Sequence, residues 1–186
     1  MSLPNILTIT RIILTFVFVF LIFQYGFSAK VLAAIVFTLA SLTDLFDGYY
    51  ARKYNLITNF GKLMDPIADK FLVLAAFFVF MQMHLIATWM FLVILVREVF
   101  VTGWRLVAMR QGKVLAAEKV GKIKTVLQIT TIFLILFYLI FIEAGHQASG
   151  YQYLFVGIYW LMIMVVSITL FSGFSYLWQN RKFFHA

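Results

Sequence analysis

Apolar runs of about 20 residues, separated by short polar breaks, follow one another along most of the chain. Runs of this length suit helices that cross a bilayer, and they lack the alternation of apolar and polar residues found in barrel strands. The pattern therefore predicts an all-α membrane protein with six transmembrane helices. The predicted spans are about 12–27, 31–52, 61–83, 87–109, 122–143 and 151–178.

Residues 3–11 mix polar and apolar side chains, and Pro4 suits the first turn of a helix. We predict that they form a short N-terminal interfacial helix that leads into the first span. Arg11 could meet a phosphate group there, but ordinary interfacial placement is the favoured interpretation. Because no linker, repeat or soluble segment interrupts the chain, residues 1–186 are expected to form a single transmembrane domain.

The composition agrees with a membrane protein, since 64% of the residues are hydrophobic and 12% are charged. There is no cysteine, which excludes disulfides and thiol chemistry. The net charge of +8 is better explained by membrane topology and phosphate ligands than by nucleic acid, so no nucleic-acid partner is expected.

Basic residues also predict the orientation of the chain. Lys30 alone falls near the proposed outer loops. The positive-inside rule therefore places both termini and the acidic stretch described next on the cytosolic side of a bacterial cytoplasmic (inner) membrane, crossed in multiple passes. The basic residues that gather on that side are Arg52, Lys53, Lys62, Arg110, Lys113, Lys119, Arg181 and Lys182.

Four of the seven acidic residues fall in one stretch of apolar sequence, where charge is costly and marks a functional site. At roughly 100° per residue, Asp44 and Asp47 share one stripe of a helix. Asp65 and Asp69, at i and i+4, share one face of the next helix. Four clustered carboxylates need cations, and oxygen ligands favour Mg²⁺ or Mn²⁺, so we predict a site for two divalent cations.

Two metals at the membrane boundary suit phosphoryl-type transfer on a lipid substrate, with one carboxylate taking a proton from an attacking hydroxyl. From spacing alone, an intramembrane ion-pair network or a proton pathway stays equally open. Gly48, Ala51 and Gly61 leave room beside the carboxylates, although close helix packing is the default interpretation of a single glycine.

The arrangement Asp44-x2-Asp47-Gly48-x2-Ala51-Arg52-x8-Gly61-x3-Asp65-x3-Asp69 resembles the signature of the CDP-alcohol phosphotransferases at every fixed position. Members of this family replace the CMP of a CDP-linked lipid or alcohol with another hydroxyl, using divalent metal. They are six-helix membrane proteins that pair as dimers. The resemblance therefore implies a membrane enzyme that forms a homodimer.

The resemblance also implies a role for each residue of the signature. The implied metal ligands are Asp44, Asp47, Asp65 and Asp69, of which Asp69 is also the catalytic general base. The implied CDP-binding residues are Gly48, Ala51, Arg52 and Gly61.

Basic residues beyond the acidic stretch indicate an acceptor that itself carries phosphate. Arg97 stands near the middle of the fourth span, where it needs a partner or a polar cavity, and neighbouring Glu98 projects about 100° away from it. Segments 3–11, 97–106 and 116–125 resemble the branch of the family that forms phosphatidylglycerophosphate, whereas the last two spans match only in hydrophobic character. The predicted acceptor phosphate-binding residues are Arg97, Arg105, Lys122 and Lys124.

The implied reaction joins CDP-diacylglycerol and sn-glycerol 3-phosphate to give phosphatidylglycerophosphate and CMP. Asp69 would deprotonate the glycerol 1-hydroxyl, and direct displacement is favoured because the motif holds no Ser, Cys or His nucleophile, although a covalent intermediate on a carboxylate stays open. One alternative keeps this chemistry with inositol phosphate, serine or phosphatidylglycerol as acceptor. Another replaces it with cation or proton transport.

Overall fold

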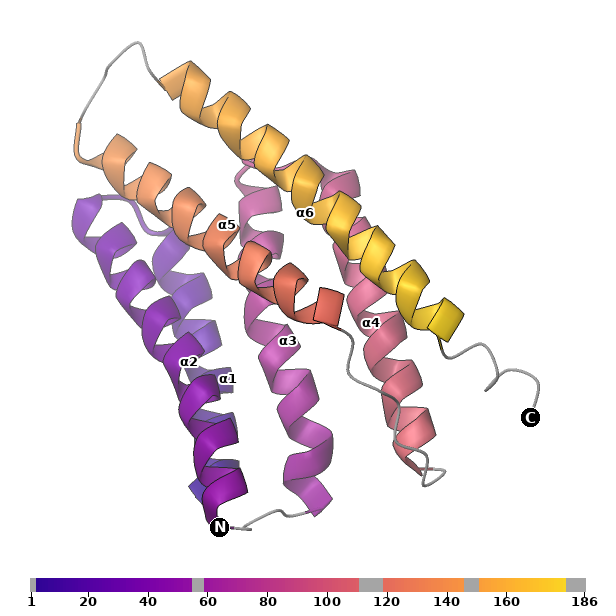
Figure 1. Ribbon diagram of the computed structural model, residues 1–186. Coiled ribbons are helices and arrows are strands. Elements are labelled where there is room, and N and C mark those ends of the chain that lie inside the picture. Colours follow the sequence, from indigo (N-terminus) through magenta and orange to yellow (C-terminus); the bar gives the residue numbers. More distant parts are fainter. Residues whose placement is uncertain (1–2, 55–58, 111–118, 146–150, 180–186) are drawn as a thin grey trace. The chain divides into compact units, whose positions relative to one another are not determined.

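The computed structural model describes residues 3–54, 59–110, 119–145 and 151–179, and these contain six helices and no strand (Figure 1). Side chains are described throughout these ranges except at 3–7, 44–54, 59–67, 69, 105, 109–110, 119–120 and 151–152. The helices are α1 (Leu3–Phe23), α2 (Phe27–Tyr54), α3 (Asn59–Gln82), α4 (Thr88–Arg110), α5 (Lys119–Glu143) and α6 (Tyr151–Gln179).

The predicted all-α class is confirmed. From the second onward, each predicted span coincides with one helix to within about one turn at either end. This agreement arises because the polar breaks in the sequence are short and the runs between them are apolar and almost free of helix breakers.

The N-terminal prediction is wrong in one respect, because residues 3–11 do not form a helix of their own. They are the first turns of α1, which continues without a break to Phe23. Pro4 lies in the first turn, where its missing N–H costs nothing, and no proline or glycine follows it within α1. The change from mixed to apolar side chains after residue 11 does not interrupt the backbone hydrogen bonds, so the helix continues through it.

Two of the helices are long and apolar enough to cross a membrane when only described residues are considered. These segments are Gly121–Glu143 in α5 and Tyr153–Gln179 in α6. Shorter apolar stretches lie in α1, α2 and α3. The chain is thus a helical protein in which two of the described segments have the length and apolar character of transmembrane helices.

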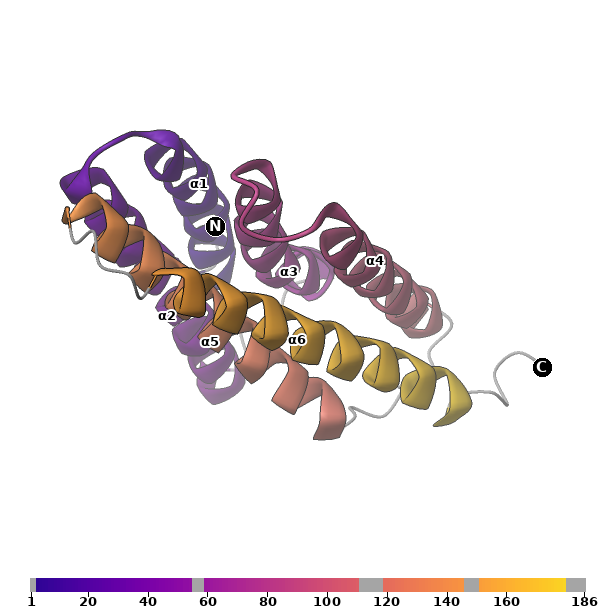
Figure 2. The same ribbon diagram turned by 90° about the horizontal axis from the view of Figure 1, so that it is seen from above.

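The chain divides into two compact units, of which the first comprises residues 1–79 and 133–149. In this unit α1 and α2 pack side by side, as both ribbon views show (Figures 1 and 2). Phe37 of α2 contacts two other helices of this unit, because its ring lies 5.4 Å from that of Phe18 in α1 and 5.5 Å from that of Phe133 in α5. Such aromatic pairs stabilise packing beyond the area they bury.

Polar contacts close the turn between α1 and α2. Gly26 has a φ of +102°, in the region that side chains rarely adopt. The buried Lys30 ammonium donates to the carbonyl oxygens of Ile22 and Gln24, at 2.7 Å each, and the Gly26 N–H donates to the Glu143 carboxylate at 3.1 Å. Carbonyls at a helix C-terminus lack partners within the helix, so Lys30 serves as a cap of α1.

The second unit comprises residues 80–132 and 150–186. Within it α4 packs against α6. Both helices carry apolar side chains that are fully buried, including Met90 and Ile94 of α4 and Met162 and Val165 of α6. This packing fixes two of the three helices that carry the polar cluster described below.

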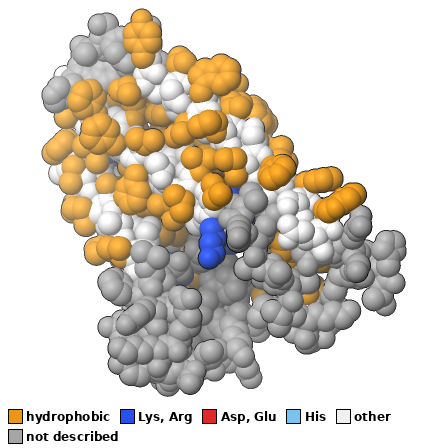
Figure 3. All heavy atoms as spheres, viewed as in Figure 1, with side chains coloured by type: hydrophobic (Ala, Val, Ile, Leu, Met, Phe, Trp, Pro, Cys, Tyr) orange, Lys and Arg blue, Asp and Glu red, His pale blue; other side chains and the backbone are white. Residues whose placement is uncertain are grey.

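Many large apolar side chains are exposed, while several polar ones are buried together with the apolar core. On α1, Thr8, Arg11 and Thr15 are at most 2% exposed, whereas Phe16 and Phe20 are 62% and 66% exposed. Apolar side chains dominate the described surface in Figure 3. A surface of this kind is stable against lipid, where exposed apolar groups cost nothing.

Candidate active site

The four aspartates of the signature lie on two consecutive helices. Asp44 and Asp47 are on α2, and Asp65 and Asp69 are on α3, each pair at the spacing of one helical face. α3 continues as one helix through Pro66. The two acid pairs thus lie on consecutive helices of the chain. The four side chains lie outside the described residues, so their meeting in one site stays a prediction.

The predicted CDP-binding positions share these helices. Gly48, Ala51 and Arg52 follow the first acid pair near the end of α2, and Gly61 lies in the first turn of α3. Their side chains also lie outside the described residues, so their contact with a nucleotide stays a prediction.

The donor chemistry of the two acid pairs fits divalent metal. Aspartate oxygens are the ligands that Mg²⁺ and Mn²⁺ prefer, and each pair comes from one unbroken helix that holds its positions rigidly. Among the side chains that the structure does describe, no three His, Asp or Glu residues gather as a metal site. The aspartates of α2 and α3 stay the predicted metal ligands.

A polar stripe on α1 belongs to the same unit as these acids. Thr8, Arg11 and Thr15 recur at helical spacing and are buried, with the Thr15 hydroxyl donating to the carbonyl oxygen of Arg11 at 2.8 Å. Along their helices, Thr8 and Asp44 are about equally far from the turn that joins α1 to α2. Their backbone positions are therefore at about the same level of this helix pair. The Arg11 side chain is 1% exposed and therefore covered by protein, while its place at the membrane interface stays a prediction.

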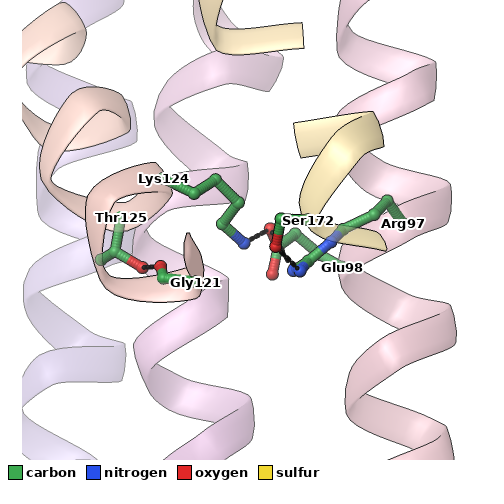
Figure 4. Close-up of polar contacts among 6 residues, drawn as sticks. All are labelled: Arg97, Glu98, Gly121, Lys124, Thr125 and Ser172. Atoms are coloured by element: carbon green, nitrogen blue, oxygen red, sulfur yellow. Dashed lines mark hydrogen bonds and ion pairs between the residues drawn. The ribbon is translucent and has the colours of Figure 1, made fainter. Parts of the chain in front are cut away.

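A second polar cluster joins α4, α5 and α6 within the other unit (Figure 4). The Glu98 carboxylate accepts from the Lys124 ammonium and from Arg97, whose Nη1 is 3.3 Å from Oε1. Arg97 also donates to the Ser172 hydroxyl, with 2.6 Å between Nη2 and Oγ. The Lys124 and Glu98 side chains are 1% and 2% exposed and that of Arg97 is 12% exposed. A buried cation of this kind needs such a partner to be stable.

The structure brings together two of the four predicted acceptor residues. Arg97 and Lys124 meet through their common contact with Glu98. Lys122, two residues before Lys124, is exposed because it lies on another face of α5. Arg105 is on α4, and its side chain lies outside the described residues.

Glu98 was the partner that sequence reasoning missed. Its Cβ direction differs from that of Arg97 by about 100°, but both side chains are long enough to bend toward each other. The sequence could have indicated this pair, because Glu98 stands beside Arg97 in the middle of an apolar span. Both charges are costly there unless they are paired.

α6 also contributes more than the hydrophobic character expected of it. Ser172 is fully buried against Arg97, and a Cβ placed on Gly173 would lie 3.2 Å from Cγ of Arg97. Small and hydroxyl residues in an otherwise apolar helix indicate that another helix packs closely there. Ser172 and Gly173 could therefore have predicted this contact from the sequence.

The sequence matches the family described as CDP-alcohol phosphatidyltransferase over residues 1–171. A protein of Bacillus subtilis (strain 168) is 39% identical over 97% of each chain and is named CDP-diacylglycerol–glycerol-3-phosphate 3-phosphatidyltransferase. Proteins with the same name from Rickettsia felis and Wigglesworthia glossinidia brevipalpis are 36% and 31% identical. These two matches cover 98% and 73% of this chain and 97% and 77% of the relatives.

Proposed function

The chain belongs to the CDP-alcohol phosphatidyltransferase family, and we propose that it transfers the phosphatidyl group of CDP-diacylglycerol to sn-glycerol 3-phosphate. The products are phosphatidylglycerophosphate and CMP, which makes the chain a transferase of phospholipid biosynthesis. The proposal is carried by one observation: relatives that bear this enzyme name match along nearly the whole chain. The two acid pairs on α2 and α3 supply a site for the chemistry.

The reaction needs a base and a means of holding phosphate. In this proposal Asp69 takes the proton of the glycerol 1-hydroxyl, whose oxygen attacks the lipid-linked phosphorus while the bond to CMP breaks. We favour direct displacement, because the signature holds no Ser, Cys or His nucleophile. Two divalent cations, Mg²⁺ or Mn²⁺, would be held by Asp44, Asp47, Asp65 and Asp69 and would neutralise charge on the phosphates.

The two substrates are assigned to separate sets of residues in this proposal. Gly48, Ala51 and Gly61 admit the CDP group closely, and Arg52 adds positive charge. Arg97 and Lys124 bind the acceptor phosphate in this proposal, and their common contact with Glu98 holds the two cations close to each other. Arg105 and Lys122 belong to the same assignment through their place in the resembling segments.

We further propose that all six helices cross the cytoplasmic membrane as a single domain over residues 1–186. The helices contain between 21 and 29 residues. At about 1.5 Å per residue, even the shortest is long enough to span a hydrocarbon core of about 30 Å. The excess of Lys and Arg on one side supports cytosolic termini and a cytosolic site, and the resemblance supports a homodimer.

An acceptor panel tests the proposed reaction. The purified chain in lipid–detergent micelles is given labelled CDP-diacylglycerol with glycerol 3-phosphate, inositol phosphate, serine or phosphatidylglycerol, with Mg²⁺, Mn²⁺ or a chelator. We expect CMP release and labelled product with glycerol 3-phosphate and metal. Product with another acceptor instead would overturn the acceptor assignment. Cation movement across vesicles without any CMP release would favour transport.

A further inference from the structure

We propose that Ser172 and Gly173 of α6 form a seat that positions Arg97 for the acceptor phosphate. We call these two residues the arginine seat. The match to the family ends at residue 171, so the seat lies beyond the segment that the family defines. The inference rests on the proposed function, because it takes Arg97 as a group that binds the acceptor.

The hydroxyl of Ser172 holds one edge of the guanidinium. Ser172 is 0% exposed, and its Oγ lies 2.6 Å from Nη2 of Arg97 (Figure 4). The Glu98 carboxylate holds Nη1 on the same guanidinium, at 3.3 Å. An arginine side chain held at two nitrogens has lost most of its rotamer freedom before a ligand arrives, so binding does not have to supply that ordering.

Gly173 leaves room for the aliphatic part of the Arg97 side chain, because it has no side chain of its own. A Cβ at this position would lie 3.2 Å from Cγ and 3.7 Å from Nε of Arg97, and the first distance is tighter than ordinary contact. The glycine serves close approach rather than an unusual backbone angle, because it lies within helix α6. At Gly157, earlier in α6, the same added Cβ would meet nothing within 4 Å.

A fixed guanidinium favours a ligand with matching geometry. Its parallel N–H groups suit two oxygens of a phosphate, whereas a neutral alcohol offers no such pair. The seat therefore serves recognition of a phosphate-bearing acceptor. Its loss should weaken binding of glycerol 3-phosphate and leave binding of CDP-diacylglycerol unaffected.

Steady-state kinetics of the purified full chain test this inference. We expect Ser172→Ala and Gly173→Ala each to raise the KM for glycerol 3-phosphate about tenfold, the scale of one hydrogen bond to a charged group. The KM for CDP-diacylglycerol should stay unchanged, and Ser172→Thr, which keeps the hydroxyl, should retain the KM of the original protein. Ser167→Ala and Gly157→Ala are matched controls on the same helix: the Ser167 hydroxyl bonds to its own helix, and Gly157 has open space beside it.

A double-mutant cycle with Arg97 separates the seat from the rest of the proposal. Ser172→Ala should have no further effect on the KM once Arg97→Ala is present, because the two residues act as one unit. If Arg97→Ala raises the KM while both seat variants behave like the controls, the seat is wrong and the reaction stands. If Arg97→Ala leaves the KM unchanged, the acceptor assignment falls and the seat falls with it. Equal loss of stability and of affinity for both substrates would reduce the seat to a packing role and overturn the proposal.

Discussion

Single side chains in the second unit illustrate how a membrane protein keeps charge inside. The Glu98 carboxylate contacts Arg97 and Lys124, which come from different helices. Each of the three would be costly alone in an apolar bundle. Their contacts therefore tie α4 to α5, and the Ser172 hydroxyl extends the cluster to α6.

Removing the shared carboxylate should destabilise the protein strongly. Glu98→Ala leaves a buried ammonium without this partner, and we expect a loss of about 3–5 kcal/mol in the free energy of unfolding. Thermal unfolding in detergent, followed by circular dichroism, measures it. Val99→Ala is the control, since Val99 is 60% exposed on the same helix. Equal midpoints for the two variants would contradict the central role of Glu98.

The general-base proposal concerns one oxygen of one residue. Asp69→Asn cannot accept the hydroxyl proton, so we expect turnover to fall by about 10²–10⁴-fold. Release of CMP with saturating metal and both substrates measures this. Glu118→Gln, an acid outside the signature, should keep normal turnover. Normal turnover of Asp69→Asn with metal still bound would remove Asp69 from the mechanism.

At the scale of helices, the turn between α1 and α2 shows how the ends of the bundle are secured. Lys30 caps α1, and Glu143 reaches the same turn from the end of α5. Sequence reasoning treated Lys30 as the exception to the positive-inside pattern. The structure gives it a local task, because the last carbonyls of α1 need a donor.

Removal of the Lys30 cap should lower the stability of the protein without affecting its activity. Lys30→Met keeps the length of the side chain but removes two charge-assisted hydrogen bonds, and we expect a loss of about 2–3 kcal/mol. The midpoint of thermal unfolding should fall, while turnover at low temperature stays near normal. Lys122→Met, at an exposed position, is the stability control. A midpoint for Lys30→Met that matches the control would show that water replaces the cap without cost.

Helices and their approximate ends could be predicted because apolar length and polar breaks are local properties of the sequence. The continuity of α1 through residues 3–11 was missed, since a change in polarity was taken for a change of element. The pairing of Arg97 with Glu98 and Ser172 was also missed. Such contacts depend on side-chain bending and on which helix lies alongside, which helical periodicity cannot supply. The signature on α2 and α3 was recognisable because its spacing is fixed within a short segment.

At the scale of the whole molecule, many large apolar side chains of the described residues are exposed, and several polar ones are buried with the apolar core. Tyr25, at the turn after α1, is 95% exposed and falls on the proposed outer side. Lys113 belongs to the proposed cytosolic side. The positions of these two residues provide a direct test of orientation, because the chain has no cysteine of its own.

Labelling of single cysteines tests that orientation. With a maleimide that cannot cross membranes, Tyr25→Cys should react in right-side-out vesicles and Lys113→Cys only in inside-out vesicles. The unsubstituted protein, which has no thiol, is the blank. The reverse pattern would place the proposed active site on the outer side, where cytosolic glycerol 3-phosphate has no access.

The carboxylate shared by Arg97 and Lys124 has a consequence for how this sequence can change over time. A neutral substitution at either cation alone alters the charge balance around Glu98, and loss of Glu98 affects both cations together. Positions 97, 98 and 124 should therefore be inherited as a set. A lineage that abandons one of them is expected to have replaced the others and, with them, its preference for a phosphorylated alcohol.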